Sequence, residues 1–328
     1  MDFLNIVLNI LSSGLPCVLL ALGIFLTYRL LDFADLTAEG SFLIGAAVTG
    51  VMIFNGVNPW IATLVSFISG ALCGFVTGCL NRFLKIPKLL SGIITMTATA
   101  SIAMLIMGAQ NGSTNMFDSQ VTFTNITYGG SQQTIYSLLF PWVYSPEAGT
   151  FIVMNPWGEV IKIAIMFGVV AIVMLGIYFF FGTEYGIAIR ATGMNEKMAK
   201  SQGINVNVAT IVCVSLANAL IGLAGSLFAQ DVKTVSTVSA TGYLVVGLAS
   251  ILIGEAIFGK RSFKNWIISV ALGSIVYFVI ITIATRLGLP TQLKNLLYAI
   301  LITIALCIPL IKISVKKLID SKKKARAE

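Results

Sequence analysis

Long apolar runs alternate with short polar segments along almost the whole chain. A helix that crosses a bilayer needs about 20 apolar residues, and most of the runs are close to this length. The runs cover residues 5–28, 41–54, 59–80, 89–109, 160–181, 206–229, 241–258, 265–285 and 293–311. The pattern predicts an all-α, polytopic membrane protein with about nine transmembrane or half-spanning helices.

Two of these runs differ from an ordinary transmembrane span in their length or position. The run at 41–54 is short and follows an acidic stretch, so we expect a broken or half helix there. The first run has no basic segment before it and no small-residue cleavage signal. It is therefore expected to be a retained span and not a signal peptide.

The composition excludes several classes of function. Hydrophobic residues make up 57% of the chain and charged residues only 10%, whereas soluble domains are nearer 45–50% and 25%. Histidine is absent, which excludes Ser-His-Asp triads, histidine zinc sites and histidine proton relays. The five cysteines lie inside apolar runs without a CxxC motif, so they read as small core residues. No catalytic residue, metal site or nucleic-acid surface is expected.

Basic residues are distributed unevenly between the two sets of connecting segments. Lys162, Lys233, Arg286 and Lys294 form one set, and the other 17 of the 21 basic residues form the opposite set. The larger set consists of Arg29, Arg82, Lys85, Lys88, Arg190, Lys197, Lys200, Lys260, Arg261, Lys264, Lys312, Lys316, Lys317, Lys322, Lys323, Lys324 and Arg326. The positive-inside rule places the larger set in the cytoplasm. In a plasma or inner membrane, nine spans then give an N-terminus outside and a C-terminus inside.

A weak internal repeat links the two halves of the chain. Residues 36–47 resemble residues 238–249 at an offset of 202. The aligned glycines are Gly23 with Gly225, Gly40 with Gly242, and Gly45 with Gly247. The first copy starts at the cytoplasmic side and the second starts outside, so the halves would have inverted topology. Inverted repeats commonly place a transport pathway at their interface, with interrupted helices near the midplane. A chance similarity between two glycine-bearing helices is the alternative.

The repeat divides the chain into five segments. They are the first transmembrane repeat (1–109), an extracytoplasmic segment (110–158), a linking helix with a cytoplasmic coupling loop (159–205), the second transmembrane repeat (206–311) and a basic cytoplasmic tail (312–328). The outer segment is rich in aromatic and turn residues, and residues 135–144 fit an interfacial position. An ordinary loop and a docking surface for an extracytoplasmic partner both remain open. The tail fits a topology anchor that attracts anionic lipid.

Polar residues inside the spans are the candidates for a translocation pathway, because hydrocarbon makes them costly. Glu39 is of most interest, since its repeat partner Thr241 stands beside the equivalent glycine. The candidates are Glu39, Gly40, Thr95, Thr97, Asn218, Thr241 and Gly242. The alternative for the threonines is helix packing, with each hydroxyl bonded to a backbone carbonyl.

The loop after the fifth long span carries the most specific pattern. Asn195 is a good N-cap and Gly203 a good C′ residue, so they predict a helix of about two turns between them. Met194 and Met198 would offer a small apolar patch, and Gly193 and Gly203 would let the chain turn on both sides. Such a helix can fit a groove on a soluble partner, or be a plain loop helix.

The residues from Gly186 to Ile204, followed by residues 217–225, resemble the permease subunits of branched-chain amino acid and ribose-type ABC importers. Residues 35–42 further resemble a subgroup of aromatic or uncharacterised amino-acid permeases. The resemblance implies that the loop is a coupling helix that docks into an ATPase subunit. The coupling residues that it implies are Arg190, Gly193, Asn195, Met198, Ala199, Gly203 and Ile204.

The resemblance also implies that the energy source is another chain. Residues 254–260 come close to a Walker A motif, but Arg261 replaces the required Ser or Thr. ATP and Mg²⁺ are therefore expected on the ATPase, and this chain is expected to be no enzyme and to bind no cofactor. The expected partners are ATPase subunits, an extracytoplasmic solute-binding protein, a second permease copy and membrane lipid.

The expected function is inward movement of a small solute by alternating access. The resemblance implies an amino acid, and its subgroup an aromatic one. A secondary transporter driven by an ion gradient is the alternative, and it would use Asp35 and Glu39 as its ion site.

Overall fold

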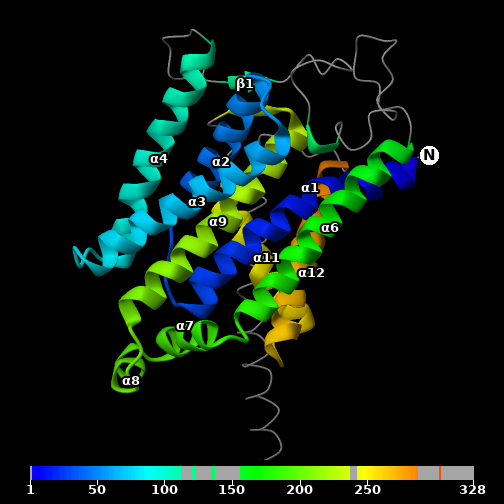
Figure 1. The fold of residues 1–328 in the computed structure, drawn as a ribbon. Helices are drawn as coiled ribbons and strands as arrows, with labels where there is room; N and C mark the ends of the chain where they lie inside the picture. The colour runs from blue at the N-terminus through cyan, green and yellow to red at the C-terminus, as the bar shows by residue number, and fades with distance from the viewer. Residues whose placement is uncertain are drawn as a thin grey trace, which may run out of the picture.

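The computed structural model describes residues 2–111, 120–122, 134–136, 156–236, 242–286 and 303. It is a bundle of long helices with a short antiparallel ribbon at one end (Figure 1). The helices are α1 (Asp2–Phe25), the π-helix η1 (Leu26–Leu30), α2 (Thr37–Phe54), α3 (Pro59–Arg82), α4 (Lys88–Asn111), α6 (Pro156–Phe180), α7 (Glu184–Met194), α8 (Glu196–Ser201), α9 (Val206–Val232), α11 (Tyr243–Phe258) and α12 (Phe263–Arg286). The strands are β1 (Gln120–Thr122) and β2 (Thr234–Ser236).

The predicted helical membrane fold is confirmed. Within the described residues, seven helices are long and apolar enough to cross a membrane, and α11 is a shorter apolar helix. These eight helices account for eight of the nine apolar runs. The run at 293–311 and the basic tail lie outside the described residues.

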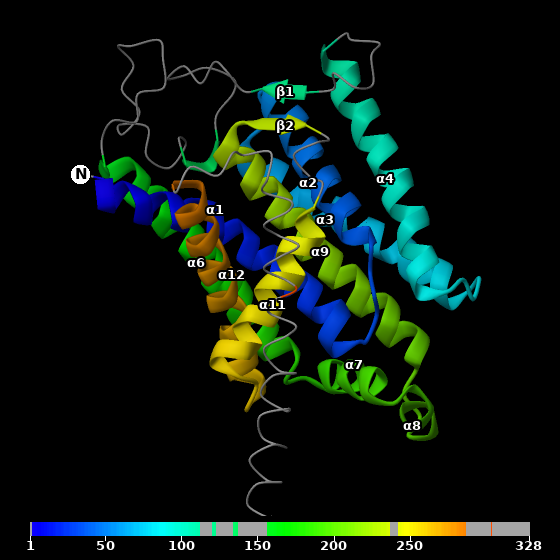
Figure 2. The same ribbon diagram turned by 180° about the vertical axis from the view of Figure 1, so that it is seen from behind.

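The bundle has two chemically different ends. The α7–α8 end holds α7, α8 and the end of α1, whereas the ribbon end holds β1, β2 and the N-terminus (Figures 1 and 2). Basic side chains predicted to share one side gather at the α7–α8 end, as contacts of Arg29, Arg82 and Lys88 show. Lys162 bonds to Asp231 near the opposite end of α9. The predicted sorting of charge between the two ends is therefore present, and the side of the membrane that each end faces stays a prediction.

Helix α2 begins inside the bundle. Ser41 Oγ donates to Asn218 Oδ1 at 2.7 Å, and Thr49 Oγ1 donates to Ser226 Oγ at 2.7 Å. Both bonds join residues 177 positions apart, so α2 runs parallel to α9 in a constant register. In this register α2 starts two turns after the start of α9, which is about 12 Å at 1.5 Å per residue. Residues 32–35, which precede α2, have no regular secondary structure. This start inside the bundle is that of an interrupted helix, but the 18 residues of α2 are long enough to cross a membrane, so the prediction of a half helix is not confirmed.

Helix α11 is the counterpart of α2 at the other end. It packs along α1, where Gly247 faces Ala21 and Ile24 and where Glu255 bonds to Arg29 at 2.6 Å. These contacts make α11 parallel to α1 and place its start near the middle of that helix. From the middle of the bundle, α2 therefore runs to the ribbon end and α11 to the α7–α8 end (Figure 2).

The packing of the helices follows the inverted repeat. Helix α2 packs on α9, and α11 packs on α1; α3 packs on α2 and α9, and α12 packs on α11 and α1. Exchanging α1 with α9, α2 with α11 and α3 with α12 thus preserves the neighbours. Helices α1 and α9 run in opposite directions (Figure 1). This agreement supports a true inverted repeat over a chance similarity of glycine patterns.

Glycines let α3 and α9 approach closely. Gly70, Gly74 and Gly78 all face α9, and a Cβ on Gly70 or Gly74 would overlap a backbone carbonyl oxygen of that helix. Small residues at such contacts are typical of membrane helix pairs. The spacing of these three glycines at every fourth position thus fixes the face of α3 that is buried.

The ribbon is the one departure from the all-α expectation within the described residues. Strands β1 and β2 pair antiparallel, with Val121 opposite Val235. Nearby, the backbone N–H of Ile135 donates to Gln230 Oε1 at 3.0 Å, and Tyr136 is buried. Parts of the predicted segment 110–158 therefore pack on the ribbon end of the bundle. Three-residue strands are too short for their alternation to be detected in a sequence.

Candidate functional site

Helices α2 and α11 meet at their first turns. The backbone N–H of Gly242, which caps α11, donates to Glu39 Oε1 at 3.1 Å. Beside this bond, the rings of Phe42 and Tyr243 stack with centroids 4.4 Å apart and an interplanar angle of 19°. Gly242 has a φ of 90°, a left-handed conformation that favours glycine. We call this meeting point the junction.

The junction lies near the middle of the bundle. Glu39 precedes Ser41 by two residues, and Ser41 bonds to Asn218, which is close to the midpoint of α9. Glu39, Gly242 and Tyr243 are all partly exposed. A charged side chain at this depth is costly in contact with lipid. This face of the bundle should therefore meet water or another protein surface.

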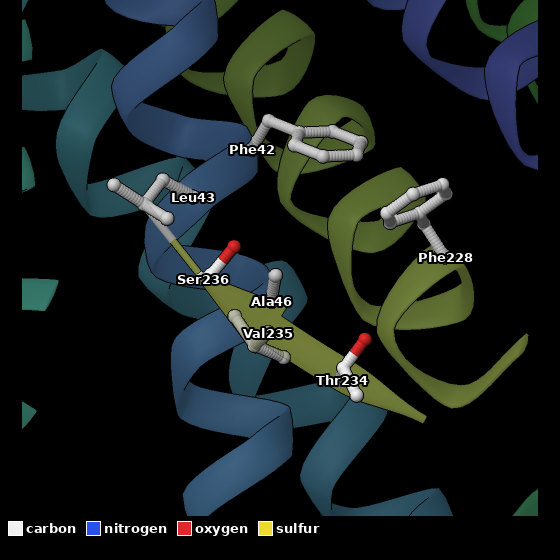
Figure 3. A pocket seen from close by; sticks show the side chains of 7 residues that line it. All are labelled: Phe42, Leu43, Ala46, Phe228, Thr234, Val235 and Ser236. Carbon is white, nitrogen blue, oxygen red and sulfur yellow. The ribbon is translucent and has the colours of Figure 1, made fainter. Parts of the chain in front are cut away.

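A small pocket adjoins the junction on the same face of α2 (Figure 3). Its lining residues are Phe42, Leu43, Ala46, Phe228, Thr234, Val235 and Ser236. Glu39, Phe42, Leu43 and Ala46 follow the spacing of three and four residues that places side chains on one side of a helix. The pocket is thus mostly apolar, with two hydroxyl groups from β2 and a carboxylate one turn away.

Asn218 lies behind α2, in the packing between that helix and α9. Its Nδ2 donates to Asp35 Oδ2 at 2.6 Å and to the carbonyl of Val214 at 3.0 Å, and its Oδ1 accepts from Ser41. Asp35 Oδ1 also accepts from the backbone N–H of Thr37 at 2.9 Å. Because Asn218 is fully buried, the structure places it as a tie between α9 and the segment before α2.

The other predicted pathway residues are divided among different surroundings. Gly40 faces α4, where a Cβ would overlap Thr99 Oγ1. Thr95 is buried and donates to the carbonyl of Ser91 at 3.0 Å. Thr97 is exposed on another face of α4 and donates to its own backbone. Thr241 lies outside the described residues. Of the predicted set, the structure thus brings Glu39 and Gly242 together and leaves Thr97 apart.

The predicted capped helix is present as α8. Asn195 Oδ1 accepts from the backbone N–H of Met198 at 3.1 Å, which is a side-chain N-cap. At the other end Gly203 has a φ of 80°, and the N–H of Ile204 donates to the carbonyl of Ala199 at 3.1 Å. Ala199 is 2% exposed and Met198 is 61% exposed. Helix α8 therefore presents a methionine outward and packs its alanine inward.

Gly193 does not form the sharp turn that the sequence suggested. It lies within α7 and faces η1, where a Cβ would overlap the carbonyl oxygen of Leu30. The role of this glycine is close contact between α7 and the end of α1. The sequence did not predict α7, because its apolar and polar residues do not separate clearly onto two faces of a helix.

Two arginines fix the platform formed by α7 and α8. Arg190 donates to the carbonyl of Phe181 at 2.9 Å and lies over the ring of Phe263, 5.1 Å from its centroid. Arg82, at the end of α3, bonds to Glu196 of α8 at 2.7 Å. The hydrogen bond from Arg82 lowers the pKa of Glu196 below its ordinary value. The platform is thus joined to α3, α6 and α12.

Sequence reasoning missed the aromatic residues of the junction. Phe42, Phe228 and Tyr243 form a three-ring cluster, with centroids 5.6 Å apart for Phe42 and Phe228 and 5.3 Å apart for Phe228 and Tyr243. Phe42 and Tyr243 each follow one of the two aligned glycines within two residues. Their position beside the aligned glycines could have marked Phe42 and Tyr243 as candidate site residues. Phe228 has no such mark, since its sequence context resembles that of other core aromatic residues.

Residues 6–306 match the family described as "Branched-chain amino acid transport system / permease component". The chain belongs to this permease family. It is therefore a multi-pass ABC transporter permease, as the resemblance in the sequence implied.

The permease is similar to several named relatives over most of its length. It is 32% identical to the "Tyrosine transport system permease protein" of Clostridioides difficile, over 95% of this chain and 94% of that one. It is 26% identical to the "Probable branched-chain amino acid transport permease protein LivH" of Methanocaldococcus jannaschii, over 80% of this chain and 78% of that one. The structure of "PsaBC from Streptococcus pneumoniae in complex with Fab" is distant, with a TM-score of 0.37 and 16% identity over 84% of this chain and 89% of that chain.

Proposed function

We propose that the permease is the translocation subunit of an importer that moves an amino acid, of aromatic type, across the membrane. The family supports the amino-acid class, and the tyrosine permease of C. difficile supports the aromatic type. The basic residues at the α7–α8 end support a cytoplasmic position for that end. In this orientation the N-terminus and the ribbon end are outside.

One observation carries the proposal: α7 contacts the chain segment that leads to the junction. Gly193 touches the carbonyl of Leu30 in η1, and residues 31–36 then lead to the first turn of α2. Glu39 in that turn bonds to Gly242 at the start of α11. A shift of the platform would therefore be passed to the junction of α2 and α11. Transport then consists of switching between two stabilised states, without covalent chemistry.

The exposed methionines of the platform suit a protein partner. Met194 is 88% exposed and Met198 is 61% exposed, and methionine packs adaptably in grooves. We assign this surface to an ATPase subunit that holds ATP and Mg²⁺. A second permease copy would complete the pathway, and a solute-binding protein would dock at the ribbon end.

Reconstitution tests the docking surface. Vesicles that contain the permease, its ATPase and its binding protein should take up L-tyrosine only when ATP is supplied. Met198→Asp should prevent the ATPase from co-purifying with the permease, because a charge would enter an apolar contact. Met198→Leu, which keeps the apolar surface, should behave as wild type. Uptake without ATP, or normal uptake by Met198→Asp, would contradict the proposal.

A matched pair of glycine variants tests the path from platform to junction. Gly193→Leu would clash with Leu30, whereas Gly168→Leu places a side chain where no atom lies within 4 Å. We expect Gly193→Leu to lose ATP-driven uptake while it still reaches the membrane, and Gly168→Leu to transport normally. Equal uptake by the two variants would show that the contact of α7 with η1 is not needed.

One observation favours a second candidate, an ion-gradient transporter. Neither Asp35 nor Glu39 forms a salt bridge with a residue of the described ranges, so either could hold a cation. This candidate predicts uptake in vesicles without the ATPase when a sodium or proton gradient is imposed. The ATP-driven proposal predicts no uptake under that condition.

A further inference from the structure

Within the described part of the chain, Glu39 differs from the carboxylates that join helices at the two ends of the bundle. Glu196, Glu255 and Asp231 each bond to an arginine or lysine. Among the described residues, Glu39 Oε1 accepts a hydrogen bond only from the backbone N–H of Gly242, and Oε2 accepts none. A carboxylate at mid-bundle depth without a cation is costly. A positively charged ligand would remove that cost.

Aromatic rings lie within one turn of this carboxylate. Phe42, three residues after Glu39, stacks on Tyr243, and Phe228 completes the cluster. Side chains three residues apart on a helix have Cβ atoms about 5–6 Å from one another. This spacing is comparable to the span of an aromatic amino acid from its amine to its ring. Aromatic rings bind other rings in stacked or edge-on arrangements.

The pocket beyond the rings adds polar groups of a different kind. Thr234 and Ser236 contribute hydroxyls from β2, while Leu43 and Ala46 keep the remaining wall apolar (Figure 3). With an empty volume of about 190 Å³, the pocket is smaller in this conformation than a typical small-molecule site of roughly 300–1,000 Å³. In this conformation Phe42, one turn of α2 after Glu39, stacks on Tyr243. A ligand ring would take the place of this stacking contact when α2 and α11 separate.

We infer that the junction binds a solute that carries a protonated amine and an aromatic ring. Glu39 binds the amine, and Phe42, Phe228 and Tyr243 contact the ring. This inference deepens the proposed function and rests on it, because it places solute recognition in the permease itself and not solely in the binding protein. Its rival is a purely structural Glu39 that caps the start of α11.

An isosteric variant of Glu39 distinguishes amine binding from a purely structural role. Glu39→Gln keeps an oxygen that accepts from the N–H of Gly242 but removes the negative charge. A structural cap would tolerate this change, since a neutral acceptor still satisfies the helix start. Binding of an amine would not tolerate it, because the charge-assisted hydrogen bond is lost.

The experiment measures ligand binding to the permease–ATPase complex in nanodiscs, without the binding protein. The probes are L-tyrosine, tyramine and 3-(4-hydroxyphenyl)propanoate. All three carry the same aromatic ring, but the propanoate lacks the amine. We expect wild type to bind L-tyrosine and tyramine at least tenfold more tightly than the propanoate. Glu39→Gln should weaken binding of both amines at least tenfold and leave the propanoate unchanged. Thr97→Val, on the exposed face of α4, should bind all three probes as wild type does.

Phe42→Leu tests the aromatic part of the inference separately. It should weaken binding of L-tyrosine by fivefold or more and leave binding of L-leucine within twofold of wild type. The inference is overturned if wild type binds the propanoate as tightly as tyramine, if it binds no amine, or if Glu39→Gln binds amines normally. Those results leave ATP-driven uptake intact, whereas loss of ATP-dependent uptake in wild-type vesicles would contradict the proposed function instead.

Discussion

The carboxylates at the two ends of the bundle differ from those at its centre. At the ends, each has a basic partner: Glu196 with Arg82, Glu255 with Arg29 and Asp231 with Lys162, at 2.7, 2.6 and 2.7 Å. At the centre, Asp35 and Glu39 accept hydrogen bonds only from neutral groups of the described residues. The ends are thus held by ion pairs that join different helices. No side-chain cation of the described residues pairs with the carboxyl groups at the centre.

This difference suggests a division of work within the permease. Ion pairs at the ends join α3 to α8, η1 to α11 and α6 to α9, so each end is tied across several helices. At the centre, the bond between Glu39 and Gly242 joins the starts of α2 and α11, which otherwise touch little. Movement between two states would therefore be easiest at the centre.

The largest effect is expected at the ribbon end. The side chains of Lys162 and Asp231 are 14% and 10% exposed, so Lys162→Met would leave a mostly buried carboxylate without its cation. Removing one partner of a buried pair costs about 3–5 kcal/mol. The thermal unfolding midpoint in detergent should fall accordingly and recover in the Lys162→Met, Asp231→Asn double variant. An unchanged unfolding midpoint for Lys162→Met would contradict the claim that ion pairs stabilise the ends of the bundle.

A smaller loss of stability is expected for Asn218→Ala. The change removes two buried hydrogen bonds, the one that Asn218 donates to Asp35 and the one that Asn218 accepts from Ser41. Their loss should cost about 1–3 kcal/mol. The control is Thr97→Val, whose hydroxyl is exposed and bonded to its own helix. Its effect should stay within about 0.5 kcal/mol. Unfolding midpoints of the two variants in the same detergent make the comparison, and equal midpoints would show that the tie does not stabilise the fold.

The smallest effect is expected for Glu196→Gln on the platform. Glu196 is 39% exposed in its side chain, and exposed pairs contribute at most about 1 kcal/mol. The pKa of Glu196 is lowered from 4.5 by the hydrogen bond from Arg82. Its contribution is therefore complete above that pH and is lost as the pH falls through the lowered pKa. Wild type and Glu196→Gln should differ slightly at pH 7 and converge as the pH falls below the lowered pKa of Glu196. A difference that grows on acidification would contradict this assignment.

Much of the fold was accessible from the sequence because membrane helices have a strong signal. Lipid requires long apolar helices, because an unpaired backbone polar group is costly there. Close helix packing in the membrane requires small residues, such as those of α3. The acidic residues before and within the start of α2 marked where the apolar run begins. The cap at Asn195 was equally readable, since it depends on neighbours in sequence. The aligned glycines gave the inverted repeat, which the packing of α2 and α11 then supported.

The candidate site was accessible only in part. Glu39 and Gly242 were chosen for their positions in the repeat, but their bond joins residues 203 positions apart. No local pattern shows that Asn218 would face Asp35 or that Gly193 would touch Leu30. These contacts depend on the register of packed helices, which a single sequence does not specify. For the same reason, the stack of Phe42 on Tyr243 became visible only in the structure.

A cross-linking measurement tests the central claim that α2 and α11 separate at the junction during transport. In a background without native cysteines, Phe42→Cys and Tyr243→Cys would be joined by oxidation in reconstituted vesicles. The control pair is Thr49→Cys with Ser66→Cys, at hydroxyls that already bond between α2 and α3. We predict that the first cross-link abolishes ATP-driven uptake and that reduction restores it, while the control cross-link leaves uptake unchanged. Full uptake by the permease cross-linked at the junction would contradict the account.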